Sequence, residues 1–176
     1  LPKDRYISYL GQMYLVHEAL ESQLRKAAET SEAIRSVVDE RQYQVPYLLE
    51  DLEFFGVDPG SIEPLPGTKR LIDEIEQMAS EPASLLGLHY VLEGSNNGSR
   101  FIAKGLMGAY GMAPGPGLRY MDPYGAEQRE RWLAFRTTMD EVGFSAEDSD
   151  RLLESARHMF QGIVEISDDL LAEAVS

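Results

Sequence analysis

Apolar residues recur every three or four positions along most of the chain, which is the pattern of amphipathic helices. Residues 5–27 show it first, with one face made of Tyr6, Tyr9, Leu10, Met13, Val16, Leu20 and Leu24. The same periodicity predicts helices over residues 45–55, 68–79, 82–110, 126–142 and 145–174. No segment reads as a β-strand, so we predict an all-α fold with one domain over residues 1–176.

Glycine, proline and capping residues set the predicted helix ends. Gly56 follows the 45–55 helix as a natural stop. Thr68 is the expected N-cap of the third helix, and Ser145 with Asp148 forms a capping-box-like start for the last one. Glycines and prolines over residues 111–117 end the helix predicted over 82–110 and lead into a non-helical link.

The net charge and composition of the chain limit which ligands and surfaces it can bind. The formal net charge of −14 argues against a nucleic-acid or anionic-membrane surface, and an anionic ligand would need locally concentrated basic groups. No apolar run is long enough to span a membrane, and no signal peptide is visible. The absence of cysteine excludes disulfides and thiolate ligands and fits a cytoplasmic protein.

Two glycines four residues apart interrupt the predicted helix over residues 82–110. Gly94 and Gly98 lie on one helix face, and each costs about 1 kcal/mol relative to alanine. Either another backbone or a flat ligand must therefore come close to that face. Around them lie Ser95, Asn97 and Ser99, polar residues that favour a kink in mid-helix, so we expect a site for a planar ligand and ordered water.

This segment resembles the distal helix of the heme oxygenase family, whose bacterial members carry a Glu-Gly-Ser-x-x-Gly-Gly pattern over the heme. Residues 93–99 depart from it at Ser99, where the second of two paired glycines is usual. Residues 5–21 resemble the family's second helix, and 48–56 resemble its next short helix with a Leu-x-x-Asp-Leu pattern. Residues 132–136 are similar to the late helix that supplies a basic residue to a heme propionate.

The resemblance implies a function and a set of site residues. The function is oxidative cleavage of heme, as both substrate and cofactor, to biliverdin with release of CO and iron. A reductase or ferredoxin would supply the electrons. The implied catalytic residues are Gly94, Ser95, Asn97 and Gly98, where the glycines admit the macrocycle and the polar pair holds a proton-delivering water network. The implied heme contacts are His89, Gly94, Gly98, Ser99 and Arg136.

The axial heme ligand is not assigned to this sequence. In the family it is a histidine on the first helix, before the segment that matches Leu1, so we expect it upstream of Leu1 and expect that the sequence lacks this proximal helix. His17 is a weaker candidate, because its surroundings match the second helix and favour a hydrogen-bonded structural histidine.

Two alternatives stay open from the sequence. The first is a heme-binding member of the same fold that has lost turnover, which the departure at Ser99 favours. The second is a non-heme di-iron oxidase, for which the possible ligand pairs are His17 with Glu21, His89 with Glu93, and His158 with Glu165. The kinked glycine segment has no role at a di-iron site.

Overall fold

The computed structural model describes residues 2–172 and confirms the all-α prediction, since these residues contain no strand. They form seven α-helices and three short 3₁₀ segments. Their bounds are α1 Lys3–Ala28, α2 Glu32–Val37, η1 Glu40–Gln42, α3 Val45–Phe54, η2 Pro59–Ser61, α4 Pro66–Met78, α5 Pro82–Tyr110, η3 Gly125–Glu127, α6 Gln128–Glu141 and α7 Ala146–Ala172.

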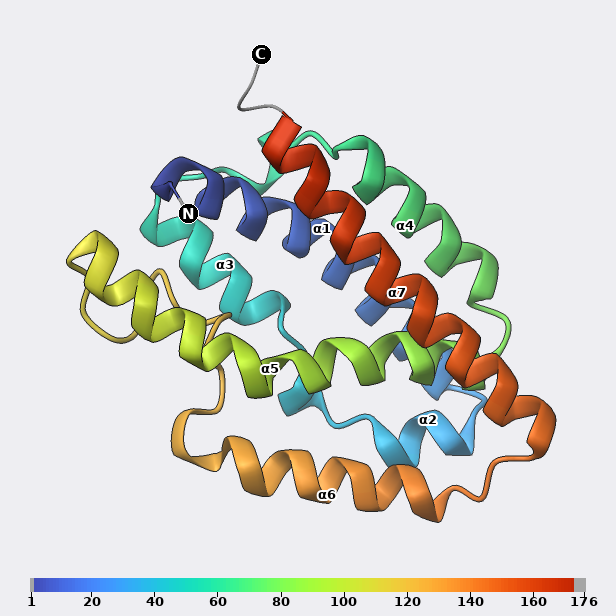
Figure 1. Ribbon diagram of the computed structural model, residues 1–176. Helices are drawn as coiled ribbons and strands as arrows, with labels where there is room; N and C mark the ends of the chain where they lie inside the picture. The colour runs from blue at the N-terminus through green and yellow to red at the C-terminus, as the bar shows by residue number, and fades with distance from the viewer. Residues whose placement is uncertain (1, 173–176) are drawn as a thin grey trace.

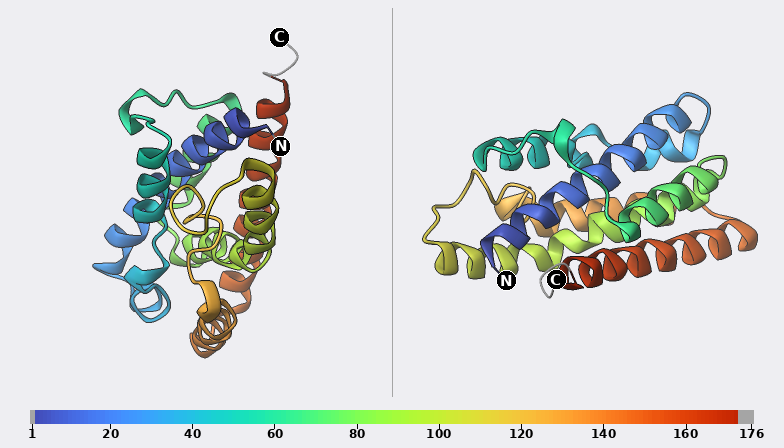
Figure 2. Two further views of the ribbon diagram at one scale, coloured as in Figure 1. Left: turned by 90° about the vertical axis from the view of Figure 1, so that its left-hand side faces the viewer. Right: turned by 90° about the horizontal axis from the view of Figure 1, so that it is seen from above.

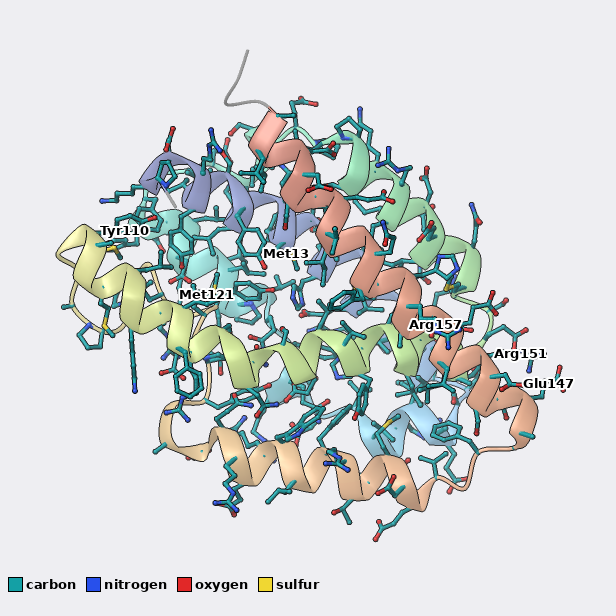
Figure 3. All side chains as sticks on the ribbon, viewed as in Figure 1. Met13, Tyr110, Met121, Glu147, Arg151 and Arg157 are labelled. Atoms are coloured by element: carbon teal, nitrogen blue, oxygen red, sulfur yellow. The ribbon has the colours of Figure 1, made fainter. Side chains whose placement is uncertain are left out.

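Helix α1 runs through the middle of the bundle, as Figures 1 and 2 show, and contacts α2, α3, α4, α5 and α7. Its predicted apolar face is the core: Tyr6, Leu10, Val16 and Leu20 are fully buried. Each such side chain stabilises the fold by about 1.5–3 kcal/mol relative to an exposed one. Figure 3 shows Met13 of α1 behind the angle between α5 and α7.

Most helix ends follow the predicted chemistry. Gly111 ends α5 in the left-handed conformation at φ 63°, and the Ser145 hydroxyl accepts a hydrogen bond from the backbone N–H of Asp148 at 3.0 Å. The prediction of Thr68 as an N-cap is wrong. Helix α4 begins at Pro66, whose fixed φ suits a first helical position, and the Thr68 hydroxyl donates instead to Gln12 Oε1 at 2.7 Å.

Three other segments either were not predicted or cannot be compared with the prediction. Helix α2 and the segment η1 were not predicted, because they are too short to show a clear apolar period. The predicted end of the last helix at residue 174 lies outside the described residues. Within residues 2–172, no helix has an apolar stretch long and uncharged enough to cross a membrane.

Helices α5 and α7 cross where α5 has a glycine. A Cβ atom added to Gly87 would collide with Ser155 Oγ and with the backbone carbonyl of Leu152 on α7. Beyond this crossing α5 bends in its middle and its second half runs away from α7 (Figure 1). The crossing therefore fixes the first half of α5 against the bundle and leaves one side of its second half uncovered.

We expect Gly87→Ala to lower the free energy of unfolding by about 2 kcal/mol, because the new methyl group meets backbone and cannot be accommodated by a rotamer change. Gly105→Ala is the matched control, since a Cβ there has nothing within 4 Å, and it should raise stability by about 0.5–1 kcal/mol through helix propensity. Urea denaturation of both variants measures the difference. Equal stability of the two variants would contradict the proposed close crossing.

Candidate functional site

Five glycines of α5 form one stripe along the helix. At about 100° per residue, all five lie within about 40° of the direction of Gly94. They are Gly87, Gly94, Gly98, Gly105 and Gly108. We call the last four the glycine face of α5.

Most of the glycine face is open. A Cβ atom added to Gly98, Gly105 or Gly108 would have no heavy atom within 4 Å. Two large apolar side chains are also uncovered here: by the same geometry Phe101, at 67% exposure, lies within the stripe between Gly98 and Gly105, and Ile102, at 54%, lies beside it. Bare backbone next to exposed apolar side chains is a surface that a flat apolar ligand can cover.

The polar run around Gly94 hydrogen-bonds to its own helix. Ser95 Oγ donates to the backbone carbonyl three residues earlier at 2.7 Å, Asn97 Nδ2 does so at 3.0 Å and Ser99 Oγ at 3.4 Å. Such bonds compete with the helical ladder and bend helices. They lie where α5 bends in Figure 1, as the sequence predicted. Helical geometry puts Ser95 and Asn97 on opposite flanks of the glycine face.

Helix α6 closes one end of the glycine face. A Cβ atom on Gly94 would lie 3.1 Å from the Trp132 ring, so this glycine lets the indole approach α5. Trp132 stacks on Phe135 with ring centroids 5.7 Å apart and also packs against Tyr90 at 5.3 Å. These aromatic contacts fix the position of Trp132 at the edge of the face.

Two arginines share the Trp132 side of α6. Arg129 and Arg136 lie one turn before and one turn after Trp132, both are exposed, and neither forms an ion pair within residues 2–172. In a chain with 30 acidic and 16 basic residues, two unpaired arginines on one helix side are a local positive edge. This is the local concentration of basic groups that an anionic ligand requires.

Behind the glycine face, two hydrogen bonds join α5 to the segment that leads into α6. Tyr124 donates its hydroxyl proton to Glu93 Oε2 at 2.9 Å, and Gln128 Nε2 donates to Asn97 Oδ1 at 3.2 Å. Glu93 and Asn97 are four residues apart on α5, and Tyr124 and Gln128 are also four apart. We call these two bonds the α5–α6 ladder. It holds the glycine segment from its buried side.

Burial changes the acidity of Glu93. Its carboxyl is 2% exposed, and desolvation raises its pKa from 4.5 to about 7. The hydrogen bond from Tyr124 and the positive charge of Arg131 act in the opposite direction and are outweighed. Burial and the nearby carboxylate raise the pKa of Tyr124, which therefore stays a proton donor. Glu93 is thus a carboxyl group that exchanges a proton near neutral pH.

The structure does not bring His89 to the glycine face. It lies five residues before Gly94, on the far side of α5, with Nε2 at 2.9 Å from Gln42 Oε1 and its ring against Phe135. Burial lowers the pKa of His89 to about 3, so the imidazole is neutral. Its predicted heme contact stays a prediction, for which the structure adds no supporting geometry.

The remaining histidines also have partners. His17 is buried, with Nε2 at 3.1 Å from the Tyr120 hydroxyl and Nδ1 at 3.4 Å from Glu21 Oε1, as expected of a structural histidine. His158 is a partly exposed partner of Glu74 at 3.2 Å. Within the part of the chain that the structure describes, no three His, Asp or Glu side chains are placed to hold a metal ion. The di-iron ligand pairs are therefore not assembled.

Sequence reasoning missed three features of the site. The spacing of Gly105 and Gly108 already continued the stripe begun by Gly94, and helical geometry could have found it. The contact of Trp132 with Gly94 and the bond from Tyr124 to Glu93 had no local signal, because more than 30 residues separate the partners in each pair.

Comparison with known proteins gives one family and several structures with the same fold. The family model described as Heme oxygenase matches residues 1–169, whereas no curated protein sequence matches. Heme oxygenase-2 from Synechocystis sp. PCC 6803, solved with heme and NO, superposes with a TM-score of 0.89 at 22% identity, over 97% of this chain and 72% of that one.

Two further structures are similar. Heme oxygenase from Leptospira interrogans gives a TM-score of 0.85 at 23% identity, over 94% of this chain and 83% of that one. Heme oxygenase-1 from Synechocystis sp. PCC 6803, solved with heme, gives a TM-score of 0.87 at 17% identity, over 99% of this chain and 80% of that one. At these identities the structures establish a common fold.

The raised pKa of Glu93 predicts a pH-dependent stability that Glu93→Gln removes. The folded protein binds one more proton than the unfolded chain between pH 4.5 and 7, so this contribution to stability is present below pH 4.5 and lost as pH rises through 7. Relative to the variant, the wild type should lose about 3 kcal/mol over this window. Urea unfolding at pH 4.5 and pH 8 measures it; parallel pH profiles for both proteins would contradict the assignment.

Proposed function

The chain belongs to the heme oxygenase family, and we propose that it cleaves the heme ring to biliverdin with release of CO and iron. The observation that carries this proposal is the open glycine face of α5, with no neighbour for three of its glycines and exposed Phe101 and Ile102 beside them. A heme needs such a surface, since its macrocycle is flat, apolar and wider than a single side chain.

The residues around the glycine face fit a heme in charge as well as in shape. Heme carries two propionate groups, and guanidinium groups bind carboxylates with paired hydrogen bonds. Arg136 and Arg129 are the unpaired cations at the Trp132 end of the face. We assign the propionates to this edge, with Arg136 as the principal partner.

When bound, heme would supply the oxygen chemistry, and the protein would supply placement. Gly98 lets the α5 backbone approach the ligand, and the Trp132 ring on Gly94 limits the space at one end of the face. The exposed hydroxyl of Ser95 donates within its helix and keeps lone pairs with which it can hold water on one flank. Asn97 is fixed by the α5–α6 ladder on the other flank. Electrons would come from a reductase or ferredoxin.

The experiment that tests the function is a hemin titration of the full natural chain, followed by reductant and oxygen while the visible spectrum is recorded. We expect stoichiometric binding and conversion to a bilin. Tight binding without conversion would support the alternative, a heme-binding member without turnover. No binding at all would contradict both.

Gly98→Leu should weaken hemin binding at least about tenfold, because the new side chain occupies the open glycine face. The fold should not suffer, since a Cβ at this position meets nothing and leucine favours a helix by about 1 kcal/mol over glycine. Hemin affinity by absorbance titration and stability by urea unfolding separate the two effects.

Ser22→Leu is the matched control for this variant, because Ser22 is an exposed small residue near the C-terminal end of α1, on a different helix from Gly98. It also places a leucine on an exposed helix surface and should leave hemin affinity unchanged. Hemin binding by Gly98→Leu as tight as that of Ser22→Leu would overturn the assignment of the glycine face.

Arg136→Gln should weaken hemin binding about fivefold, as expected for loss of one partly exposed charge-assisted contact of about 1 kcal/mol. Arg157→Gln on α7 is the control, since Arg157 is also exposed and lies away from the second half of α5 (Figure 3). Both variants change the net charge equally. Equal affinity losses in the two variants would indicate a general electrostatic effect and remove the role proposed for Arg136.

A further inference from the structure

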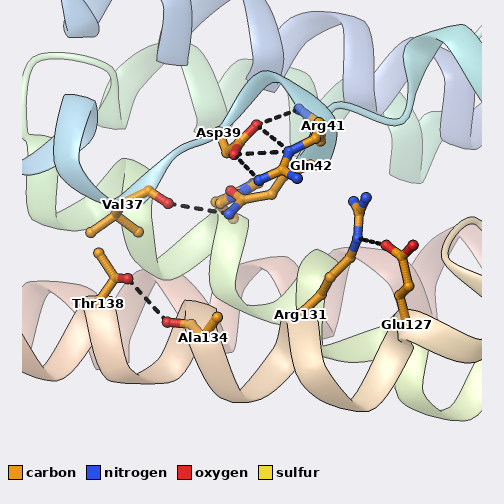
Figure 4. A network of polar contacts seen from close by, with 9 residues as sticks. Val37, Asp39, Arg41, Gln42, Glu127, Arg131, Ala134 and Thr138 are labelled. Atoms are coloured by element: carbon orange, nitrogen blue, oxygen red, sulfur yellow. Dashed lines mark hydrogen bonds and ion pairs between the residues drawn. The ribbon is translucent and has the colours of Figure 1, made fainter.

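A cavity of about 250 Å³ lies behind α5, on the side away from the glycine face. It is bounded by α2, η1 and α6, and both partners of the Tyr124–Glu93 hydrogen bond line it. Figure 4 shows three residues of its lining in their ion pairs: Arg41 of η1 pairs with Asp39 just before it, and Arg131 of α6 pairs with Glu127 at the end of η3. The cavity gives solvent a route to a carboxyl group that is otherwise buried.

We propose that this cavity supplies protons from solvent to Glu93, and that Glu93 with Tyr124 holds the proton used at the glycine face. The inference rests on the proposed function, since heme cleavage consumes protons. Glu93 would hold this proton from behind the helix, because its carboxyl is turned toward Tyr124 and the cavity. It does not line the glycine face.

The position of Glu93 carries the argument. It directly precedes Gly94 and is the one carboxylic acid between residues 90 and 105 of α5. Ser95, at the start of the polar run, has no acidic proton near neutral pH. A nearby proton donor that titrates in this range must therefore be Glu93, whose pKa is raised to about 7.

The second bond of the α5–α6 ladder lies one helical turn after Glu93, on the flank of the glycine face. Asn97 lies one turn after Glu93, accepts from Gln128 and donates to the carbonyl of Gly94. Within the described residues, Gln128 Oε1 and Asn96 Nδ2 are buried without a hydrogen-bond partner, and such groups are usually satisfied by ordered water. In each cycle Glu93 releases one proton along this layer and takes one from cavity water, and no electron moves.

The charged groups around Glu93 set its titration. The segment before α6 gives Tyr124, and α6 gives Arg131, whose positive charge opposes the rise in pKa. On η1, Arg41 is neutralised by Asp39. On α5 itself, His89 is neutral because burial lowers its pKa to about 3. The side chain of Gln44 donates a hydrogen bond to the Tyr124 hydroxyl oxygen. The backbone N–H of Gln44 donates to the carboxylate of Glu21 on α1.

Trp132 provides a readout that does not need heme. It is the single tryptophan, and its ring lies on Gly94, next to Glu93. We expect its fluorescence in the ligand-free protein to show an inflection near pH 7. The inflection should be absent in Glu93→Gln and unchanged in Glu130→Gln, which removes an exposed carboxylate from the same helix as Trp132. An inflection that persists in Glu93→Gln overturns the proposal.

Arg131→Gln is a second variant in case Glu93→Gln does not fold. Arg131 is a surface side chain, and loss of its charge should move the inflection to higher pH. An inflection that stays in place or moves to lower pH contradicts the assignment to Glu93.

The proton role itself is tested with the hemin-loaded protein. Wild-type bilin formation should slow as pH rises through the inflection seen by Trp132 fluorescence. Glu93→Gln should bind hemin with affinity within twofold of the wild type and turn over about tenfold more slowly at pH 6, without that pH dependence. An unchanged pH profile in Glu93→Gln overturns the proton role. Failure of the wild type to bind hemin overturns the proposed function and this role with it, while the Trp132 titration still reports the Glu93 ionisation.

Discussion

The site depends on a constraint that acts along one helix: α5 must be held firmly on its buried sides while its glycine face stays bare. Gly87 lets α7 cross at backbone distance, and Gly94 lets Trp132 of α6 approach in the same way. The hydrogen bond from Tyr124 to Glu93 then anchors the middle of α5 from behind. Glycine is unfavourable inside a helix, and at Gly87 and Gly94 its use is explained by contacts that a side chain would prevent.

The two sides of α5 differ in chemistry. The glycine face is open at Gly98, Gly105 and Gly108 and ends at Trp132, which shares one side of α6 with Arg129 and Arg136; a flat ligand with carboxylate groups suits this arrangement. The opposite side carries a buried polar layer in which Glu93 changes its protonation state near neutral pH because burial raises its pKa. Helix α5 thus has an open apolar side, which we propose binds the ligand, and a buried polar side, which we propose holds a proton.

Much of the fold followed from the sequence because it is helical and locally encoded. Tyr6 to Leu24 showed their shared face by spacing alone, and Gly111 and Ser145 marked helix ends by local chemistry. Thr68 misled because a buried threonine can satisfy a distant side chain as well as its own helix. The glycine face was half foreseen through Gly94 and Gly98. Its partners Trp132 and Tyr124 were not, because contacts between segments more than 30 residues apart leave no periodic trace.

A crystal structure of the full natural chain with hemin would test whether the glycine face of α5 is the heme surface, as we propose. We expect a macrocycle in contact with the backbone of Gly98 and Gly105, with a propionate toward Arg136. A heme bound elsewhere, with the glycine face still open to solvent, would contradict it.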